Sequence, residues 1–194
     1  MPSPLLRTFI AIELNTTLTQ SIADIQQQFK KANADVKWIE PPNAHITLKF
    51  LGDTSLEKIS GIQKMIQAVA SRISPFTIEF QEIGAFPQLE HPRIIWIGLK
   101  EHQNIIKDIA QQLENELASL GFPKERRDFS SHITIGRVRS LRGKAELMER
   151  IQEVTVPHLT QEINCLTLFQ STLTPQGAIY KILFQSPLLI KKRQ

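Results

Sequence analysis

Two copies of one short pattern contain the residues with the clearest chemical potential in this sequence. His45 opens the stretch HITLKF and His132 opens HITIGR, so the two histidines lie 87 positions apart (132 − 45). A threonine follows each histidine two residues later, at Thr47 and Thr134. An imidazole titrates near neutral pH and can act as a general acid or base, and a hydroxyl can donate a hydrogen bond to a phosphate oxygen. Together the two copies have the groups for acid–base chemistry at a phosphate.

The first copy has the alternation of a half-buried β-strand. Alternate side chains of a strand face the same side, so His45, Thr47 and Lys49 are expected on one face, with the apolar residues between them on the other. A single histidine on such a strand is more often a structural residue with a hydrogen-bond partner. Two copies at matching places favour a functional interpretation, because a two-fold arrangement brings both polar faces to one cleft.

The second copy contains an arginine whose position needs a departure from regular strand geometry. In a regular strand, His132 and Thr134 share a face with Gly136, and Arg137 lies on the opposite face. Arg137 therefore needs a strand-end twist, or a bulge near Gly136, to reach the histidines.

The order of the expected elements repeats along the chain. When the first half is shifted by 87 positions, FIAI at 9–12 lies on WIGL at 96–99, and each histidine motif lies on the other. Self-similarity at one offset indicates two related structural units. The sequence therefore predicts one domain with an internal repeat. Its parts are roughly 5–86 and 92–174, followed by a final strand at 178–188.

Hydrophobic periodicity predicts the individual strands and helices. Ser55 is the expected N-cap of the second helix, and a turn at 175–177 is expected to join the last two strands as a hairpin. The expected strands are 7–14, 36–40, 45–52, 76–86, 93–100, 132–140, 162–174 and 178–188, and the expected helices are 17–33, 55–73, 104–121 and 143–154.

Composition limits the class of protein. The chain has 194 residues with 41% hydrophobic and 22% charged side chains, as soluble globular domains do, and its net charge of +4 is compatible with a polyanionic substrate. Cys165 is the only cysteine, which excludes an intrachain disulfide and a thiolate metal site; it is expected to be buried. The N-terminal stretch lacks the form of a signal peptide, and no apolar run reaches the ~20 residues of a membrane span. A cytoplasmic protein without a membrane partner is expected.

These motifs resemble those of the 2H phosphoesterase superfamily. The closer resemblance is to the bacterial and archaeal RNA 2′,3′-cyclic phosphodiesterases, long labelled 2′-5′ RNA ligases, and it covers essentially the whole chain. It implies an α+β fold of two pseudo-symmetric lobes, each an antiparallel sheet flanked by helices, with the active-site cleft between them. The stretches that carry the resemblance are RTFIAIEL, HITLKFLG, GAFP with the following PRIIWIG, HITIGR and LFQSTLTPQGAIY.

The resemblance also implies roles for five residues. His45 would be the general acid that protonates the departing ribose 3′ oxygen, and His132 the general base that activates water. Thr47 and Thr134 would hold phosphate oxygens, and Arg137 would bind the phosphate. The implied reaction is hydrolysis of RNA 2′,3′-cyclic phosphate ends to 2′-phosphate ends, with neither a metal nor a nucleotide cofactor. The expected partner is RNA with such ends, the choice between tRNA fragments, other RNA ends and cyclic nucleotides stays open, and the expected state is a monomer.

Three alternatives stay open from the sequence. The same site run in reverse would join a cyclic phosphate end to a 5′ hydroxyl, although the high concentration of water favours hydrolysis. A non-catalytic RNA-binding module would keep the fold without turnover. A zinc site at His45 and His132 would need a third ligand, and no close-spaced ligand pair supports it.

Several further residues are weighed as secondary candidates. Arg7, Lys49 and Arg127 could contact phosphate or the RNA backbone, with a solvated surface position as the alternative. The aromatic candidates have lower priority, because core packing is the more usual role of tryptophan in an apolar strand. These are Trp38 and Trp96, as base-stacking residues, and Phe50 and Phe129, as lining of the cleft. The other histidines, which are expected to be structural or exposed, are His91, His102 and His158.

Overall fold

The computed structural model describes residues 4–100, 103–175 and 177–189, so that His102 and Gln176 lie outside the described residues. Its helices are α1 (Thr16–Lys30), α2 (Leu56–Ala70), α3 (Gln103–Ala118), α4 (Lys144–Glu153) and the short 3-10 helix η1 (Pro41–Asn43). Its strands are β1 (Leu5–Glu13), β2 (Val36–Trp38), β3 (His45–Ser55), β4 (Phe76–Phe86), β5 (Ile94–Lys100), β6 (His132–Val138), β7 (Thr160–Ile163), β8 (Cys165–Leu173) and β9 (Ala178–Pro187).

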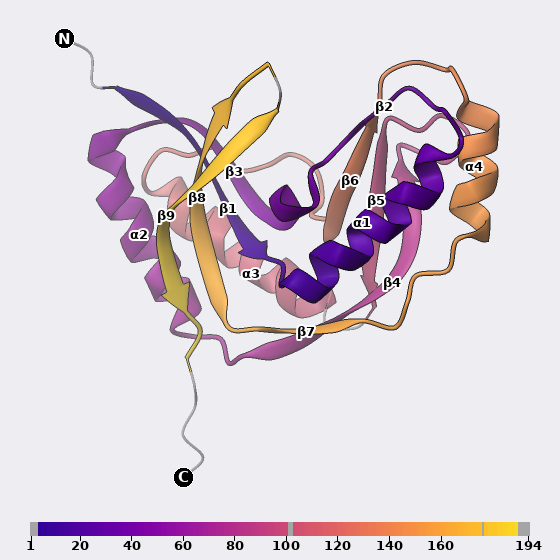
Figure 1. Cartoon of the computed structure of the whole chain (residues 1–194). Coiled ribbons are helices and arrows are strands. Elements are labelled where there is room, and N and C mark those ends of the chain that lie inside the picture. Colours follow the sequence, from indigo (N-terminus) through magenta and orange to yellow (C-terminus); the bar gives the residue numbers. More distant parts are fainter. Residues whose placement is uncertain (1–3, 101–102, 176, 190–194) are drawn as a thin grey trace.

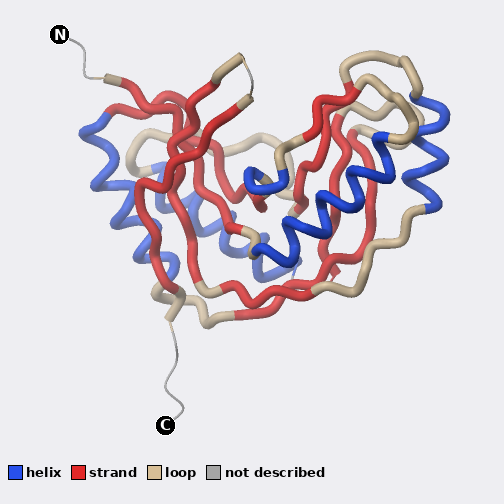
Figure 2. The backbone as a smooth tube through the Cα atoms, viewed as in Figure 1, coloured by secondary structure: helices blue, strands red, loops and turns tan. Residues whose placement is uncertain are grey.

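The strands form one antiparallel sheet that curls like half of a barrel (Figure 2). Its order is β7-β4-β5-β6-β3-β1-β8-β9, with β2 added beside β6. At the centre, β3 and β6 meet through the pair Ile46 and Ile133, which are equivalent residues of the two motifs. The sheet therefore has two halves on either side of this pair, and the predicted α+β class with antiparallel sheets flanked by helices is confirmed.

Two of the helices exchange places between the halves. Figure 1 shows α2 and α3 against the half with β1, β3, β8 and β9, and α1 and α4 against the half with β4, β5 and β6. Yet α1 follows β1 in the chain, and α3 follows β5. A buried Gln26 on α1 donates to the carbonyl of Ile135 on β6 at 2.9 Å. Because each half needs a helix from the other, the two halves share one hydrophobic core.

One detail of the sequence prediction was wrong. The expected strand 162–174 is divided after Ile163, since β7 pairs with β4 in one half of the sheet and β8 pairs with β1 in the other. The predicted N-cap position of Ser55 in α2 is confirmed, although its hydroxyl makes no capping hydrogen bond. The residue also ends β3, where it pairs with Leu5. In α1, by contrast, Asn15 Oδ1 accepts a hydrogen bond from the Leu18 amide at 2.9 Å.

Candidate active site

The central strand pair determines where the two motifs meet. Ile46 and Ile133 are fully buried, and the antiparallel register around them places His45 on the side of Thr134, and Thr47 on the side of His132. Since neighbouring residues of a strand face opposite sides, the two histidines and two threonines share the other side of the sheet. We call this side the histidine face.

Each motif strand contains a β-bulge at the same place. Leu48 on β3 has no partner in the ladder with β1, because Ala11 pairs with Thr47 and Ile10 pairs with Lys49. Ile135 on β6 is likewise skipped in the ladder with β5, and it lies 87 positions after Leu48 (135 − 48). A bulge inserts one extra residue, so the alternation of faces reverses beyond it.

The bulge at Ile135 brings Arg137 to the histidine face, as the sequence analysis requires. Arg137 is exposed; burial is the main reason why the pKa of His45 and of His132 is lowered, and the Arg137 guanidinium charge lowers both pKa values further. The same charge acts on Tyr180 of β9, so one arginine lies within electrostatic reach of all three rings. The described residues thus place Arg137 on the histidine face, within electrostatic range of both imidazoles.

The bulge at Leu48 has the opposite effect on Lys49, which the sequence pattern wrongly placed beside His45. Only 1% of the Lys49 side chain is exposed; its ammonium pairs with Glu114 of α3 at 2.8 Å and donates to the carbonyl of Pro123 at 3.0 Å. Lys49 is therefore a core residue and not a phosphate ligand. Phe50, the next residue, is 55% exposed and lies 6.0 Å from Phe9 between ring centroids.

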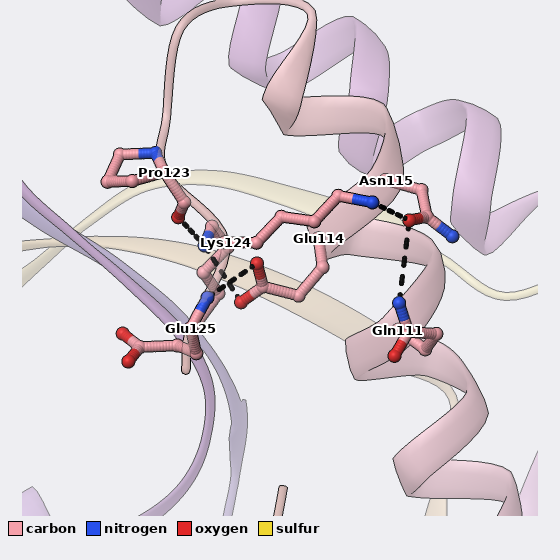
Figure 3. Close-up of polar contacts among 7 residues, drawn as sticks. Gln111, Glu114, Asn115, Pro123, Lys124 and Glu125 are labelled. Atoms are coloured by element: carbon pink, nitrogen blue, oxygen red, sulfur yellow. Dashed lines mark hydrogen bonds and ion pairs between the residues drawn. The ribbon is translucent and has the colours of Figure 1, made fainter. Parts of the chain in front are cut away.

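Glu114 also holds the segment that leads to His132. Figure 3 shows its carboxylate turned from α3 toward the segment from Pro123 to Glu125. The amide of Glu125 donates to Glu114 Oε2 at 3.2 Å, and the ammonium of Lys124 donates to Asn115 on the same helix at 2.6 Å. Strand β3 and the connection into β6 are thus both tied to α3.

Both imidazoles are oriented in the same way. His45 Nδ1 lies 2.7 Å from the carbonyl of Asn43, and His132 Nδ1 lies 2.8 Å from the carbonyl of Ser130. A carbonyl can only accept, so in each ring the Nδ1–H donates and Nε2 is the nitrogen available for proton exchange. The two-residue offset to the carbonyl is identical in both copies, so the repeat extends to the tautomer.

The surroundings favour the neutral form of both rings. Burial lowers the pKa of His45; the hydrogen bond to Asn43 opposes this, and the charges of Arg137 and His132 lower the pKa further. Burial likewise lowers the pKa of His132, against the hydrogen bond to Ser130 and together with the charge of Arg137. The two imidazoles and the guanidinium therefore share one electrostatic environment.

Aromatic rings surround His45, and the sequence analysis did not single them out. Phe9 lies 4.8 Å from His45 between centroids, Tyr180 meets it edge-on at 5.3 Å, and Phe169 stacks on Phe9 at 5.1 Å. His132 is contacted edge-on by Phe86 at 5.0 Å. The missed signal was the alternation of RTFIAIE, which places Phe9 on the face opposite the buried isoleucines of β1.

Among the secondary aromatic candidates, the two tryptophans differ. Trp38 stacks on Phe29 at 6.2 Å and packs against the hydrophobic core. Trp96 packs against Phe86 at 5.1 Å and lines a cavity near His132 together with Phe129.

The remaining candidate residues make no contact with His45 or His132 among those found in the described part of the chain. Arg7 is exposed, and its charge acts on Tyr180. Arg127 and His91 are also exposed, and His158 lies 2.9 Å from Glu79. Within residues 4–100, 103–175 and 177–189, no group of three His, Cys, Asp or Glu side chains is arranged to hold a metal ion. No helix of these residues is long and apolar enough to cross a membrane.

Comparison with known proteins agrees with the repeat and with the fold. The RNA 2′,3′-cyclic phosphodiesterase of Methanocaldococcus jannaschii is 36% identical over 179 residues, which are 92% of this chain and 98% of that protein. The protein of the same name from Methanothermobacter thermautotrophicus is 35% identical over 177 residues, 90% of this chain and 94% of that protein.

Solved structures show the same fold at lower identity. A Thermus thermophilus protein superposes with a TM-score of 0.80 at 21% identity, over 96% of this chain and 100% of that one. Escherichia coli LigT in its apo form gives 0.73 at 24% identity, over 96% and 99%. The family model for LigT-like phosphoesterases matches this chain twice, over residues 12–96 and 97–180. The chain therefore belongs to the LigT-like phosphoesterase family.

Proposed function

We propose that the protein hydrolyses RNA 2′,3′-cyclic phosphate ends to 2′-phosphate ends, without a metal, by a two-histidine acid–base mechanism. The observation that carries the proposal is the matched pair of imidazoles. Each has its Nδ1 engaged by a backbone carbonyl, and both lie within reach of the Arg137 charge. The names of the curated relatives support the substrate class.

The reaction assigns opposite tasks to the two rings. In an in-line opening, base and acid stand on opposite sides of phosphorus. His132 Nε2 takes a proton from water as the water oxygen bonds to phosphorus, and His45 Nε2 gives a proton to the ribose 3′ oxygen as its bond to phosphorus breaks. The bound phosphate is anionic, which favours the protonated form of His45 that this task needs.

The remaining groups act on the charge of the phosphate. Thr47 and Thr134 donate hydrogen bonds to its non-bridging oxygens, one from each motif. Arg137 contributes a positive charge on the same side of the sheet, which offsets the charge that develops on these oxygens in the transition state. One arginine serves both halves, since residue 50, its equivalent in the first copy (137 − 87), is a phenylalanine.

The test uses a short RNA with a 2′,3′-cyclic phosphate end and three proteins: the wild type, His45→Ala and His132→Ala. The expected result is a 2′-phosphate product from the wild type, identified by phosphorus NMR, and a loss of about 10²–10⁴-fold in each variant. Adding an RNA with a 5′ hydroxyl would reveal any ligated product in the same samples. Equal turnover by all three proteins, or a 3′-phosphate product, would contradict the proposal.

A further inference from the structure

A cavity beside His45 has no role in the acid–base mechanism. It measures about 220 Å³. Pockets for drug-sized ligands measure roughly 300–1,000 Å³, so this one suits a single ring system. Glu13 pairs directly with His45 in the β1–β3 ladder, and directly opposed residues face the same side of a sheet. The cavity is lined by Glu13, Leu14, Pro42, Asn43, Ala44, His45, Phe169, Tyr180 and Ile182.

The carboxylate of Glu13 is held in one orientation. The hydroxyl of Thr167 donates to its Oε1 at 2.6 Å, and the side-chain amide of Gln185 donates to the same oxygen at 2.7 Å. These two bonds occupy the two acceptor positions of Oε1. No donor among the described residues reaches Oε2, so this oxygen keeps both of its acceptor positions for a ligand.

The cavity combines acceptors with aromatic surface. None of its lining residues, all in the described part of the chain, is Lys or Arg. Asn43 donates its side-chain N–H to the carbonyl of Ala178 at 3.0 Å, which leaves the amide oxygen as an acceptor. Phe169 and Tyr180 contribute ring surface on which a base can pack. Such a site suits a flat ring that presents hydrogen-bond donors.

We propose that this cavity binds the base of the terminal nucleoside and that Glu13 selects guanine; the inference rests on the proposed function. Guanine presents two adjacent donors, N1–H and the 2-amino group, to the free carboxylate oxygen. Uracil presents one N–H between two carbonyl oxygens, which the carboxylate repels. Adenine presents its amino group beside a ring nitrogen acceptor. Glu13 would thus determine specificity without exchanging a proton with the substrate.

The decisive experiment measures binding, so that it does not depend on turnover. Calorimetry with guanosine and uridine 2′-monophosphates is expected to show at least about tenfold tighter binding of the guanosine compound to the wild type. This factor corresponds to the net contribution of a hydrogen bond to a charged group. In Glu13→Gln, the new side chain can keep its oxygen toward Thr167 and Gln185 while an amide group replaces Oε2. We expect this variant to bind both compounds within about twofold of each other.

A matched control and turnover data complete the test. Glu162→Gln changes an exposed carboxylate on β7 and should keep the wild-type preference. Hydrolysis of guanosine and uridine 2′,3′-cyclic phosphates should show the same change of preference in kcat/KM. Equal binding of both compounds by the wild type, no binding of either, or an unchanged preference in Glu13→Gln would overturn the role of Glu13. Guanine-selective binding with no hydrolysis would instead defeat the proposed function alone.

Discussion

The two halves of the molecule hold equivalent histidines in different surroundings. His45 is packed among aromatic rings and lines a cavity together with Glu13. His132 is contacted by Phe86, and the segment before it lines a cavity of about 240 Å³ with charged residues such as Lys107. The backbone frame is the same in both halves, including the bulge and the carbonyl that receives Nδ1–H. The repeat therefore constrains geometry, and the side chains around it are free to differ.

The largest expected effect is the loss of activity when either histidine is replaced. Changing the leaving group of the substrate then separates the role of the acid from that of the base. Each alanine variant should lose about 10²–10⁴-fold in kcat on an ordinary cyclic phosphate. A cyclic analogue with sulfur in place of the 3′ oxygen has a leaving group that needs no proton. On this analogue His45→Ala should recover most of its rate, whereas His132→Ala should stay slow. Single-turnover rates of both variants on both substrates are the measurement.

The same experiment tests whether the halves differ at all. If both variants recover equally on the sulfur analogue, the two rings are interchangeable and the assignment of acid and base is wrong. The double variant, with both histidines replaced by alanine, tests whether the two histidines act independently. Because residues that act as a unit are strongly non-additive, it should lose much less than the product of the two single losses.

Which of these features the sequence predicts depends on whether local pattern or long-range pairing decides them. Alternation indicated the strands around both histidines, and the 87-residue offset between His45 and His132 indicated their equivalence. A bulge leaves no mark in a strand pattern, so alternation alone puts Lys49 on the wrong face, and only the ladder with β1 reveals the bulge. The pattern shows that α1 and α3 each bury a face, but not that they do so in opposite halves of the sheet. The sequence pattern does not reveal the break after Ile163 either, because the pairing of β7 with β4 and of β8 with β1 is long-range.

The next effect is on stability and compares the two exchanged helices. On α3, Glu114→Gln leaves the buried ammonium of Lys49 without its carboxylate, which should cost about 3–5 kcal/mol. On α1, Gln26→Leu removes neutral hydrogen bonds to Ile39 and Ile135, which should cost about 1–3 kcal/mol. Urea unfolding of both variants measures the difference.

A control on the same helix distinguishes burial from charge. Glu116 pairs with Arg72 at 2.9 Å, with 30% and 56% of the two side chains exposed. Glu116→Gln should therefore cost less than about 1 kcal/mol. Equal losses for Glu114→Gln and Gln26→Leu would show that the buried ion pair is no more important than an amide contact.

A smaller effect concerns Trp96 on β5, which pairs with Gly84 of β4. Trp96 in the second half is the equivalent of Phe9 in the first (96 − 87), and Gly84 is the equivalent of Ser171 (171 − 87). A Cβ atom at position 84 would overlap the Trp96 ring. Gly84→Ala should therefore cost about 1–3 kcal/mol. Adding Trp96→Phe should recover most of this loss, because the smaller ring leaves room for the Cβ atom at position 84. Thermal unfolding checks it; a double variant no more stable than Gly84→Ala would contradict the steric explanation.

The smallest expected effect is a shift of the pH profile, and it tests what the halves share. Burial and the charge of Arg137 lower the pKa of both histidines below about 6.5. The base must be neutral and the acid protonated, so the optimum of kcat/KM lies midway between two lowered values and thus on the acid side of about 6.5.

Arg137→Gln removes a charge that lowers both pKa values, so both should rise and the profile should move to higher pH. Arg139→Gln, an exposed residue on the same chain segment, should leave its position unchanged. A shift to lower pH in Arg137→Gln, or a shift of one limb alone, would mean that the arginine does not act on both halves.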